Sequence, residues 1–423
     1  MRSAILLFPL AICVCAAGPS RSADVPPSPD QEIGRHFQIN GSELPAPYAE
    51  KASSNSSDTT ERGDRKPIVP DGFSASLFAD GLRNPRQMLV LADGGVLVAD
   101  QSAGTVLLLR DADRDGAAET RSTVAQDFSQ PYGLAIATAG SRKGEVLVSD
   151  ARGIWSLPWK PGEAALPPQA PLAASPVTHQ GVFGRGGGHS TRSLAVDPRD
   201  GRMFVGVGSS SNVAIEAEPR ATLQVFDADG RNQRTFASGT RNPMGVGFNP
   251  ATGALWAVVQ ERDGLGDHLV PDYFAAIRDG GFYGWPYAYT GGKPMPGFAD
   301  KAPDKVAATV MPDLLFEAHS SSMDFVFYGG DQFPARYRGG AFVALRGSWN
   351  RGEPTGYKVV HVPFKDGRPS GGYDNFATGF WVGGKGNAVV WGRPSSVAEL
   401  PDGSLLIGDD TGGTIWRVTY TGS

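Results

Sequence analysis

The sequence predicts an all-β protein with the architecture of a six-bladed β-propeller, and three observations support this. The 423 residues include 56 glycines and 33 prolines, about a fifth of the chain, against roughly 12% in an average protein, which indicates many turns. One pattern, two apolar strands joined by a turn, occurs six times. No long segment shows helical periodicity. Blades around a channel are built from such repeats, whereas two stacked β-sandwiches, the alternative, do not explain a sixfold pattern.

The first residues read as a secretory signal peptide, residues 1–18. Arg2 precedes an apolar run, residues 4–14, and small residues follow. Such a run is too short to span a bilayer. The chain's cysteines, Cys13 and Cys15, both lie within it, so the mature chain is expected to be periplasmic or secreted, with no disulfide or covalently attached haem. A short buried helix and a lipid anchor at Cys13 or Cys15 are the alternatives.

Residues 19–69 are rich in proline, serine and charge and are expected to form an irregular arm, partly docked at best. The whole chain carries 39 basic and 44 acidic residues, a net charge of −5, with no long basic run. Nucleic acid is therefore not an expected partner. No other apolar run reaches about 18 residues, so no transmembrane segment is expected.

The repeats begin after residue 70, and each is expected to supply a β-hairpin. Alternating and β-branched residues favour strands over helices. In chain order the paired strands are 86–92 with 95–100, 132–137 with 145–150, 192–198 with 202–208, 244–250 with 254–260, 323–330 with 341–347, and 395–400 with 404–410. A further strand, residues 73–79, is expected to pair with the last C-terminal strand and close the ring, which removes exposed sheet edges.

Residues just before the first strand of each repeat should meet at one mouth of the channel, since the innermost strand of each blade lines it. Arginines, histidines and carboxamides gather at these positions: Arg83, Asn84, Gln130, His189, Arg241, Asn242, His319 and Arg393. Burying several guanidinium groups together is costly without an anion. The pattern thus predicts a ligand with several carboxylates or phosphates. Alternatively, these arginines bond carbonyls between blades.

His189 follows three glycines and precedes a strand. A histidine at a channel mouth is a candidate general base because it titrates near neutral pH; an ordinary loop histidine is the alternative. Two acidic loops suit Ca²⁺. One, residues 260–273, carries Glu261, Asp263, Asp267 and Asp272. In the other, Asp111, Asp113 and Asp115 match the first half of an EF-hand loop, and a plain Asp-rich turn explains them equally well.

Six motifs occur in order over residues 70–420: GGHSTRSLAVDP, SGTRNPMGVGFNP, ERDGLGDHLVPDY, DGGFYGWPY, RGSWNRGEPTGYKVVHVPF and WGRPSSVAELPDGSLLIGDDTGGTIWRV. On these motifs the chain resembles the quinoprotein family of soluble glucose and sorbosone dehydrogenases, most closely the sorbosone dehydrogenase-like branch. The resemblance implies a six-bladed propeller, residues 70–423, that binds pyrroloquinoline quinone (PQQ) and Ca²⁺. It agrees with the predicted anion site, since PQQ carries three carboxylates.

The resemblance also implies an activity: oxidation of a sugar, aldose or aldosone by hydride transfer to PQQ, with electrons passed to a separate acceptor. His189 corresponds to the catalytic base, and Arg241 stabilises charge on the quinone. The residues that correspond to cofactor contacts are Gln130, Arg241, Asn242, Arg346 and Arg393. The main-chain carbonyls of Asp263 and Gly264 correspond to calcium ligands.

Two positions depart from the family pattern. In this chain, Trp391 stands where the family pattern has a second cofactor arginine. Ser209 stands near the position where the family pattern has an aspartate that steadies the base. A Ca²⁺-dependent lactonase-type propeller is one alternative function, but it needs carboxylates around its metal where this mouth is rich in arginine and histidine. A non-catalytic sugar-binding propeller is the other.

Overall fold

The computed structural model describes residues 28–161, 171–184 and 187–422. The predicted signal peptide, residues 1–18, lies outside them. Regular structure in the described residues is almost entirely β-sheet, so the predicted all-β class is confirmed. The helices found there are short: η1 (Pro29–Gln31), η2 (Gly41–Glu43), η3 (Ala299–Lys301), α1 (Pro303–Ala307) and η4 (Ala335–Tyr337). None of them has the length and apolar character that a bilayer crossing needs.

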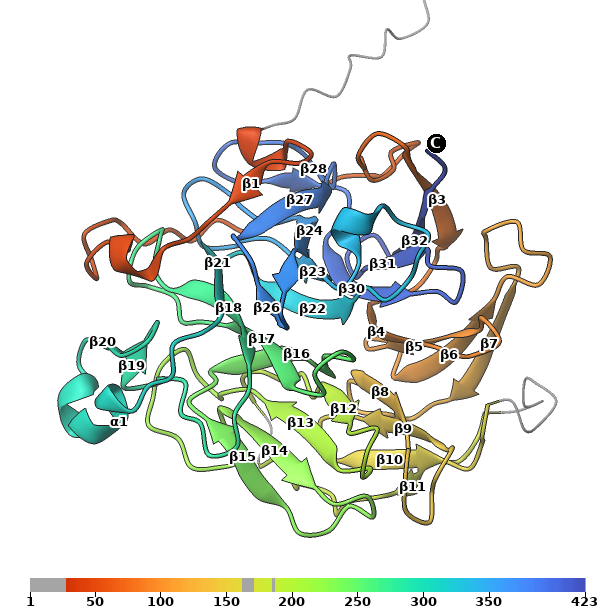
Figure 1. Cartoon of the computed structure of the whole chain (residues 1–423), viewed down its shortest axis with the longest axis horizontal. Helices are drawn as coiled ribbons and strands as arrows, with labels where there is room; N and C mark the ends of the chain where they lie inside the picture. The colour runs from red at the N-terminus through yellow and green to blue at the C-terminus, as the bar shows by residue number, and fades with distance from the viewer. Residues whose placement is uncertain (1–27, 162–170, 185–186, 423) are drawn as a thin grey trace, which may run out of the picture.

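Six sheets of four or more antiparallel strands account for most of the described chain (Figure 1). The first is β4 (Pro85–Val90), β5 (Val96–Asp100), β6 (Thr105–Arg110) and β7 (Thr120–Ala125). The second is β8 (Gly133–Ile136), β9 (Val146–Ser149), β10 (Ile154–Leu157) and β11 (Ser175–Pro176). The third is β12 (Leu194–Val196), β13 (Met203–Val207), β14 (Thr222–Phe226) and β15 (Arg234–Ser238).

The other three sheets follow in the same way. The fourth is β16 (Asn242–Phe248), β17 (Leu255–Gln260), β18 (Pro271–Ala276) and β21 (Leu314–Ala318). The fifth is β22 (Ser322–Phe327), β23 (Ala341–Leu345), β24 (Lys358–Val362), β27 (Tyr373–Ala377) and β1 (His36–Phe37). The sixth is β30 (Pro394–Glu399), β31 (Leu405–Asp409), β32 (Thr414–Tyr420) and β3 (Phe73–Ala79).

Three small sheets complete the described β-structure: β19 (Ala288–Tyr289) with β20 (Lys293–Pro294), β25 (Phe364–Lys365) with β26 (Arg368–Pro369), and β2 (Asp58–Thr59) with β29 (Val389–Val390) and β28 (Trp381–Gly383). The six predicted hairpins are confirmed as the first two strands of the six large sheets. The predicted pairing of residues 73–79 with the last strand is confirmed too, since β3 pairs with β32 from Phe73 opposite Tyr420 to Ala79 opposite Ile415.

Strands such as β5, β13, β23 and β31 are buried along their whole length because both faces of their sheets are covered. In β5, Val96 and Val98 pack into a cluster with residues of β31 and β32, whereas Leu97 and Ala99 pack into a cluster with residues of β8 and β9. All four side chains are fully buried. Burying a valine or leucine side chain contributes about 1.5–3 kcal/mol, so each strand holds two neighbouring sheets together.

The first strands of the six sheets meet around a common centre (Figure 1). β4 contacts β8, β8 contacts β12, β12 contacts β16, β16 contacts β22, β22 contacts β30, and β30 contacts β4. Loops that lead into these strands therefore converge from distant parts of the sequence.

The N-terminal arm differs from the expectation. From residue 28 onward it is docked rather than loosely attached: β1 extends the fifth sheet beside β27, and β2 pairs with β29. Lys358, fully buried in β24, bonds the carboxylate of Asp30 at 2.9 Å. A buried lysine is stable only with a charge partner, and the arm supplies it. The composition of the arm does not predict this docking, because the arm contacts residues that are far along the chain.

Candidate active site

A pocket of about 340 Å³ opens among the loops at one end of the third, fourth and fifth sheets. Its lining comes from the loop before β12, the segment after β13, the residue before β16, the end of β17 and the segment after it, β18, the loop before β22 and the loop after β23. The lining residues are Gly188, His189, Ser210, Ser211, Asn212, Arg241, Gln260, Glu261, Asp263, Asp272, His319, Ser321, Trp349 and Asn350. The structure thus brings together three of the predicted site residues, His189, Arg241 and Asp263.

His189 is held with one ring nitrogen toward the protein. Its Nδ1 lies 3.0 Å from the carbonyl oxygen of Ser209 and 3.1 Å from the Ser209 Oγ. Since the Ser209 hydroxyl donates to the carbonyl of Ser211, both Ser209 atoms accept, and Nδ1 carries the proton. The Nε2 lone pair is therefore free to act as a base. Burial, followed by the charge of Arg241, lowers the pKa of His189 to about 4, so the imidazole is neutral at pH 7.

Close backbone packing places His189 there. Gly188 has φ +63°, and a Cβ on it would lie 2.4 Å from the backbone of Ser210. Only glycine permits this approach. Ser209, near which the resemblance implies an aspartate, is the residue that bonds the His189 ring, although a serine adds no negative charge.

Arg241 precedes β16 and is almost fully buried. Its guanidinium donates to the carbonyl oxygens of Asn212 at 3.0 Å and Glu261 at 2.7 Å, and its Nη2 lies 3.5 Å from Asp263 Oδ2. The carbonyl contacts match the alternative expected for the arginines. They also fix the guanidinium at the wall of the pocket that His189 lines.

Three carboxylates line the same pocket. Burial raises the pKa of Glu261 to about 8 and that of Asp272 to about 6. Burial also acts to raise the pKa of Asp263, but the hydrogen bond from His319 and the charge of Arg241 outweigh it and lower that pKa. Of the acidic residues predicted after β17, Glu261, Asp263 and Asp272 therefore line the cavity, whereas Asp267 accepts from the Gly352 N–H outside the lining.

His319 and Asn350 contact the carboxylate of Asp263 and each other; the sequence predicted His319 at the channel mouth but gave Asn350 no role. The amide of Asn350 donates to Asp263 Oδ1 at 2.6 Å and lies 3.1 Å from His319 Nδ1. The His319 Nε2 bonds the carbonyl of Gly266 at 3.0 Å. The repeat pattern places His319 before β22, but Asn350 follows no pattern and is found only from the fold.

A second cluster, the arginine cluster, consists of Arg86, Arg346 and Arg393 around Asp410. Arg86 and Arg346 both form ion pairs with Asp410. Arg393 donates to the carbonyl oxygens of Arg346 at 3.1 Å and Gly347 at 2.6 Å. Burial, followed by the charge of Arg346, lowers the pKa of Arg393 to about 10. Asp410 directly follows β31, in a motif that sequence reasoning took only as a strand.

The arginine cluster adjoins the pocket through the backbone. The N–H of Arg346 donates to the carbonyl of Ser321 at 2.9 Å, and Ser321 lines the pocket. Arg346 and Arg393 are thus next to the pocket but bonded to protein groups. Their assignment to the cofactor stays a prediction.

The remaining predicted site residues lie elsewhere around the centre. Gln130 is exposed, with φ +57°. Asn242 is buried behind Arg241, where its Nδ2 donates to Gln260 and its Oδ1 finds no hydrogen-bond partner among the described residues. Gly264 follows Asp263 outside the pocket lining, and the Asp263 carbonyl accepts hydrogen bonds from Asn212 and Arg262. Trp391 is a core residue stacked on Phe380.

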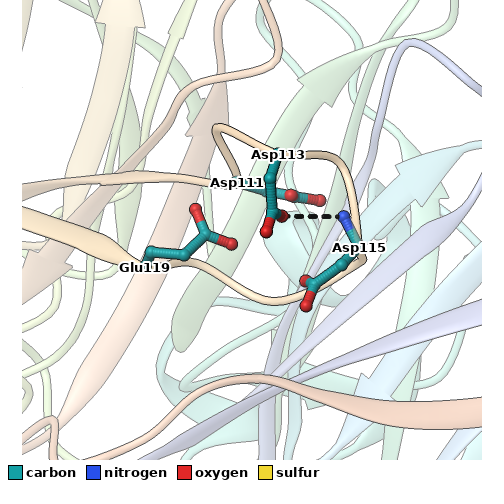
Figure 2. Close-up of side chains that lie close together, drawn as sticks. All are labelled: Asp111, Asp113, Asp115 and Glu119. Atoms are coloured by element: carbon teal, nitrogen blue, oxygen red, sulfur yellow. Dashed lines mark hydrogen bonds between the residues drawn. The ribbon is translucent and has the colours of Figure 1, made fainter.

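The exposed acidic loop, residues 111–119, brings four carboxylates together (Figure 2). One oxygen from each of Asp111, Asp113, Asp115 and Glu119 lies within 4.8 Å of the others. Glu119 was not expected to take part. The loop is also built as an ordinary turn, because Asp111 accepts from the Gly116 N–H and Asp113 from the Asp115 N–H. Calcium binding and a plain turn both stay predictions here.

Comparison with known families identifies the chain. The model described as TrAA12-like matches residues 67–270 and 294–421, well over half of the sequence, and the chain belongs to this family. The model described as Glucose / Sorbosone dehydrogenase matches residues 218–348, which includes Arg241, Asp263 and His319. The general family resemblance is therefore confirmed, whereas the sorbosone branch stays a prediction.

Curated relatives are similar over part of their length. An uncharacterized protein of Borreliella burgdorferi is 32% identical over 235 residues, 55% of this chain and 61% of that protein. A pyrroloquinoline quinone-dependent pyranose dehydrogenase of Coprinopsis cinerea is 27% identical over 350 residues, 70% of this chain and 44% of that protein. The chain thus spans about half the length of these two relatives.

Solved structures share the fold. The holo form of the Coprinopsis cinerea pyranose dehydrogenase PQQ domain superposes with a TM-score of 0.70 at 20% identity, covering 85% of this chain and 98% of that one. The calcium structure of the Trichoderma reesei family AA12 enzyme superposes with a TM-score of 0.68 at 21% identity, covering 86% and 100%. At these identities the likeness shows the fold.

Proposed function

We propose that this protein is a PQQ- and Ca²⁺-dependent dehydrogenase that oxidises a sugar or aldehyde. The observation that carries the proposal is the pocket itself. A neutral histidine with a free Nε2 faces a buried guanidinium and three carboxylates, and a cluster of three arginines adjoins it. The relatives named as PQQ-dependent sugar dehydrogenases support the same reaction class.

The arginine cluster suits a planar molecule with several carboxylates. Three guanidinium groups gather around the carboxylate of Asp410, and burial, followed by the charge of Arg346, lowers the pKa of Arg393. An anion placed there would relieve this repulsion through charge-assisted hydrogen bonds. PQQ would be held between Arg346 and Arg393 on one side and Arg241 and Asn242 on the other, with Gln130 as a further contact.

The pocket also suits a hard cation, because Ca²⁺ prefers carboxylate and carbonyl oxygens. Glu261, Asp263 and Asp272 supply such oxygens around one cavity. The proposed ligands remain the main-chain carbonyls of Asp263 and Gly264. For the Asp263 carbonyl to bind the cation, it has to give up its hydrogen bonds from Asn212 and Arg262.

The residues of the chain then have separate roles in the reaction. Bound PQQ supplies the chemistry of a hydride acceptor. His189 Nε2 takes the proton of the substrate hydroxyl, and the bond from Nδ1–H to Ser209 holds the ring in the required tautomer. The guanidinium of Arg241, fixed by two carbonyls, presents positive charge where negative charge grows during the reaction. Trp349, 47% exposed, partly covers the mouth against water.

The fold and location complete the proposal. The six large sheets would be six blades of a propeller over residues 70–423, closed by the pairing of β3 with β32. The first 18 residues would be a signal peptide that sends the protein to the periplasm or outside the cell. Electrons would pass from the cofactor to a separate acceptor.

Reconstitution tests the function. The purified protein is incubated with PQQ and Ca²⁺ and assayed on a panel of aldoses, aldosones and small aldehydes with an artificial electron acceptor. We expect turnover that depends on both additions. Absence of dye-linked activity on every substrate would contradict the proposal.

A Ca²⁺-dependent lactonase is the second candidate. The sequence does not favour a lactonase, because the predicted channel mouth is rich in arginine and histidine where a lactonase needs carboxylates. The structure, however, places Glu261, Asp263 and Asp272 in the pocket lining. Hydrolysis of sugar lactones with Ca²⁺ and without PQQ would favour the lactonase, and the same substrate panel can include them.

A further inference from the structure

The N-terminal arm reaches the rim of the pocket. We name residues 48–60 the strap, because this segment crosses the loops that carry the pocket residues. Tyr48 N–H donates to the carbonyl of Leu265 at 2.8 Å, and the carboxylate of Glu50 lies 2.8 Å from His268 Nδ1. Both partners follow Asp263 in the acidic loop.

Asn55 binds the other rim loop, residues 349–351. Its N–H donates to the carbonyl of Trp349 at 2.7 Å. Its side-chain Oδ1 accepts from the Arg351 N–H at 2.9 Å, and its Nδ2 donates to the Arg351 carbonyl at 2.5 Å. The same Nδ2 donates to the carbonyl of Gly386. A side-chain amide has two donor hydrogens and one acceptor oxygen, and Asn55 uses all of them.

The residue between these two contacts, Asn350, is the one that connects the pocket walls. Its amide donates to Asp263 and lies against His319. Asn55 fixes the backbone on both sides of it, at Trp349 and at Arg351. The orientation of Asn350, and that of the half-exposed indole of Trp349 at the mouth, therefore depends on the strap.

The strap is held firmly at its far end. The N–H groups of Asp58 and Thr60 donate to the carbonyls of Ala388 and Val390, each at 2.8 Å, where β2 pairs with β29. Because one end is tied to this small sheet and the other to the acidic loop, Asn55 lies in a segment of fixed position. Ordering the strap costs conformational entropy, and this entropy is lost when the protein folds, before substrate binds.

We propose that Asn55 is a positioning residue: through residues 349–351 it aligns Asn350 and Trp349 for substrate binding, and the N-terminal strap is thus a working part of the pocket. For its effect on turnover this inference rests on the proposed dehydrogenase function. It assigns no chemistry to Asn55, which touches neither the base His189 nor Arg241.

The test compares Asn55→Ala with Asn40→Ala in the full chain. Asn40 lies in the same arm, and its side chain bonds only to Ser42 and Glu43 among the described residues. In Asn55→Ala we expect KM for the sugar to rise about tenfold while kcat changes by less than about threefold, the pattern of lost binding rather than lost chemistry. Asn40→Ala should leave both constants within about twofold.

Amide hydrogen exchange gives a second readout that needs neither cofactor nor substrate. The Arg351 N–H should exchange at least about tenfold faster in Asn55→Ala than in Asn40→Ala, since it loses its acceptor. If Asn55→Ala does not fold, Asn55→Asp, which keeps an acceptor for that N–H, replaces it. In Asn55→Asp we expect KM for the sugar to rise while the Arg351 N–H stays protected from hydrogen exchange.

The outcomes separate the inference from the proposed function. In Asn55→Ala, an Arg351 exchange rate equal to that of Asn40→Ala overturns the inference whatever the activity, and in Asn55→Asp an unchanged KM overturns it. A fall in kcat with KM unchanged also overturns it. If the wild type shows no PQQ-dependent activity, the proposed function fails, and the exchange comparison still decides whether the strap fixes residues 349–351.

Discussion

The two sides of the centre use arginine in different ways. On the pocket side, Arg241 bonds backbone carbonyls and lies beside Asp263, and the surrounding carboxylates leave a cavity. On the other side, Arg86, Arg346 and Arg393 crowd around Asp410. Both sides present positive charge to the same centre, and the described pocket and the candidate base His189 lie on the first.

This difference bears on the prediction that the buried arginines bind an anionic ligand. Buried guanidinium groups were expected to require an external anion. The structure shows that carbonyls and Asp410 already satisfy much of that need, so the arginines alone do not establish a ligand. The excess of three guanidinium groups over the carboxylate of Asp410 and the cavity beside His189 carry the proposal instead.

The largest effect is expected on the pocket side. His189→Ala should lower kcat by about 10²–10⁴-fold, the usual contribution of a general base, and should leave PQQ affinity within about threefold because the arginines remain. Steady-state kinetics and a cofactor titration measure the two quantities. A variant that keeps its full rate would remove His189 as the base.

On the other side, Asp410→Asn should weaken the fold and strengthen anion binding. Removing a buried carboxylate from two guanidinium partners costs about 3–5 kcal/mol of unfolding free energy. Asp402→Asn is the matched control, since Asp402 pairs with Arg417 at the surface and should cost at most about 1 kcal/mol. Thermal melts and PQQ titration measure both effects; weaker PQQ binding in Asp410→Asn would contradict the excess-charge argument.

The pH dependence of kcat/KM should follow the protonation of His189. Its pKa in the folded protein, about 4, lies below the usual 6.5 because burial and Arg241 disfavour the charged ring. The base is therefore neutral at higher pH, and kcat/KM should fall only as pH drops toward 4. Its contribution to folding stability is complete above pH 6.5 and is lost between 6.5 and 4. A limb of the kcat/KM profile near 6.5 would contradict the burial of the ring.

The smallest effect is expected at the exposed acidic loop. Asp113→Asn should change turnover by less than about twofold, because this loop lies outside the pocket and surface substitutions of this kind are usually mild. Dye-linked assays at saturating Ca²⁺ measure it. A large loss would mean that the loop acts on the active centre.

Much of the fold could be predicted from the sequence because it depends on local pattern. Alternating apolar residues around a turn, as in β16 and β17, give a hairpin wherever they occur. The outer strands of the first five sheets were not predicted. β21, for example, is separated from β18 by 37 residues that include two small strands and two short helices, and no local signal connects the two strands.

The site was only partly predictable, for the same physical reason. His189, Arg241 and His319 each precede a first strand, so the repeat places them together. Asn350, Asp410 and Asn55 act through contacts with residues far along the chain. The docking of the arm likewise depends on the buried pair of Asp30 and Lys358, 328 residues apart.

The central claim is that both sides of the centre hold one planar, triply anionic molecule. A titration of PQQ in the presence of Ca²⁺, followed by its absorbance, tests it with one variant from each side, Arg241→Ala and Arg393→Ala. We predict that each variant weakens binding by about tenfold or more, the size expected for a charge-assisted hydrogen bond. Wild-type affinity in either variant would contradict a ligand that spans the two sides.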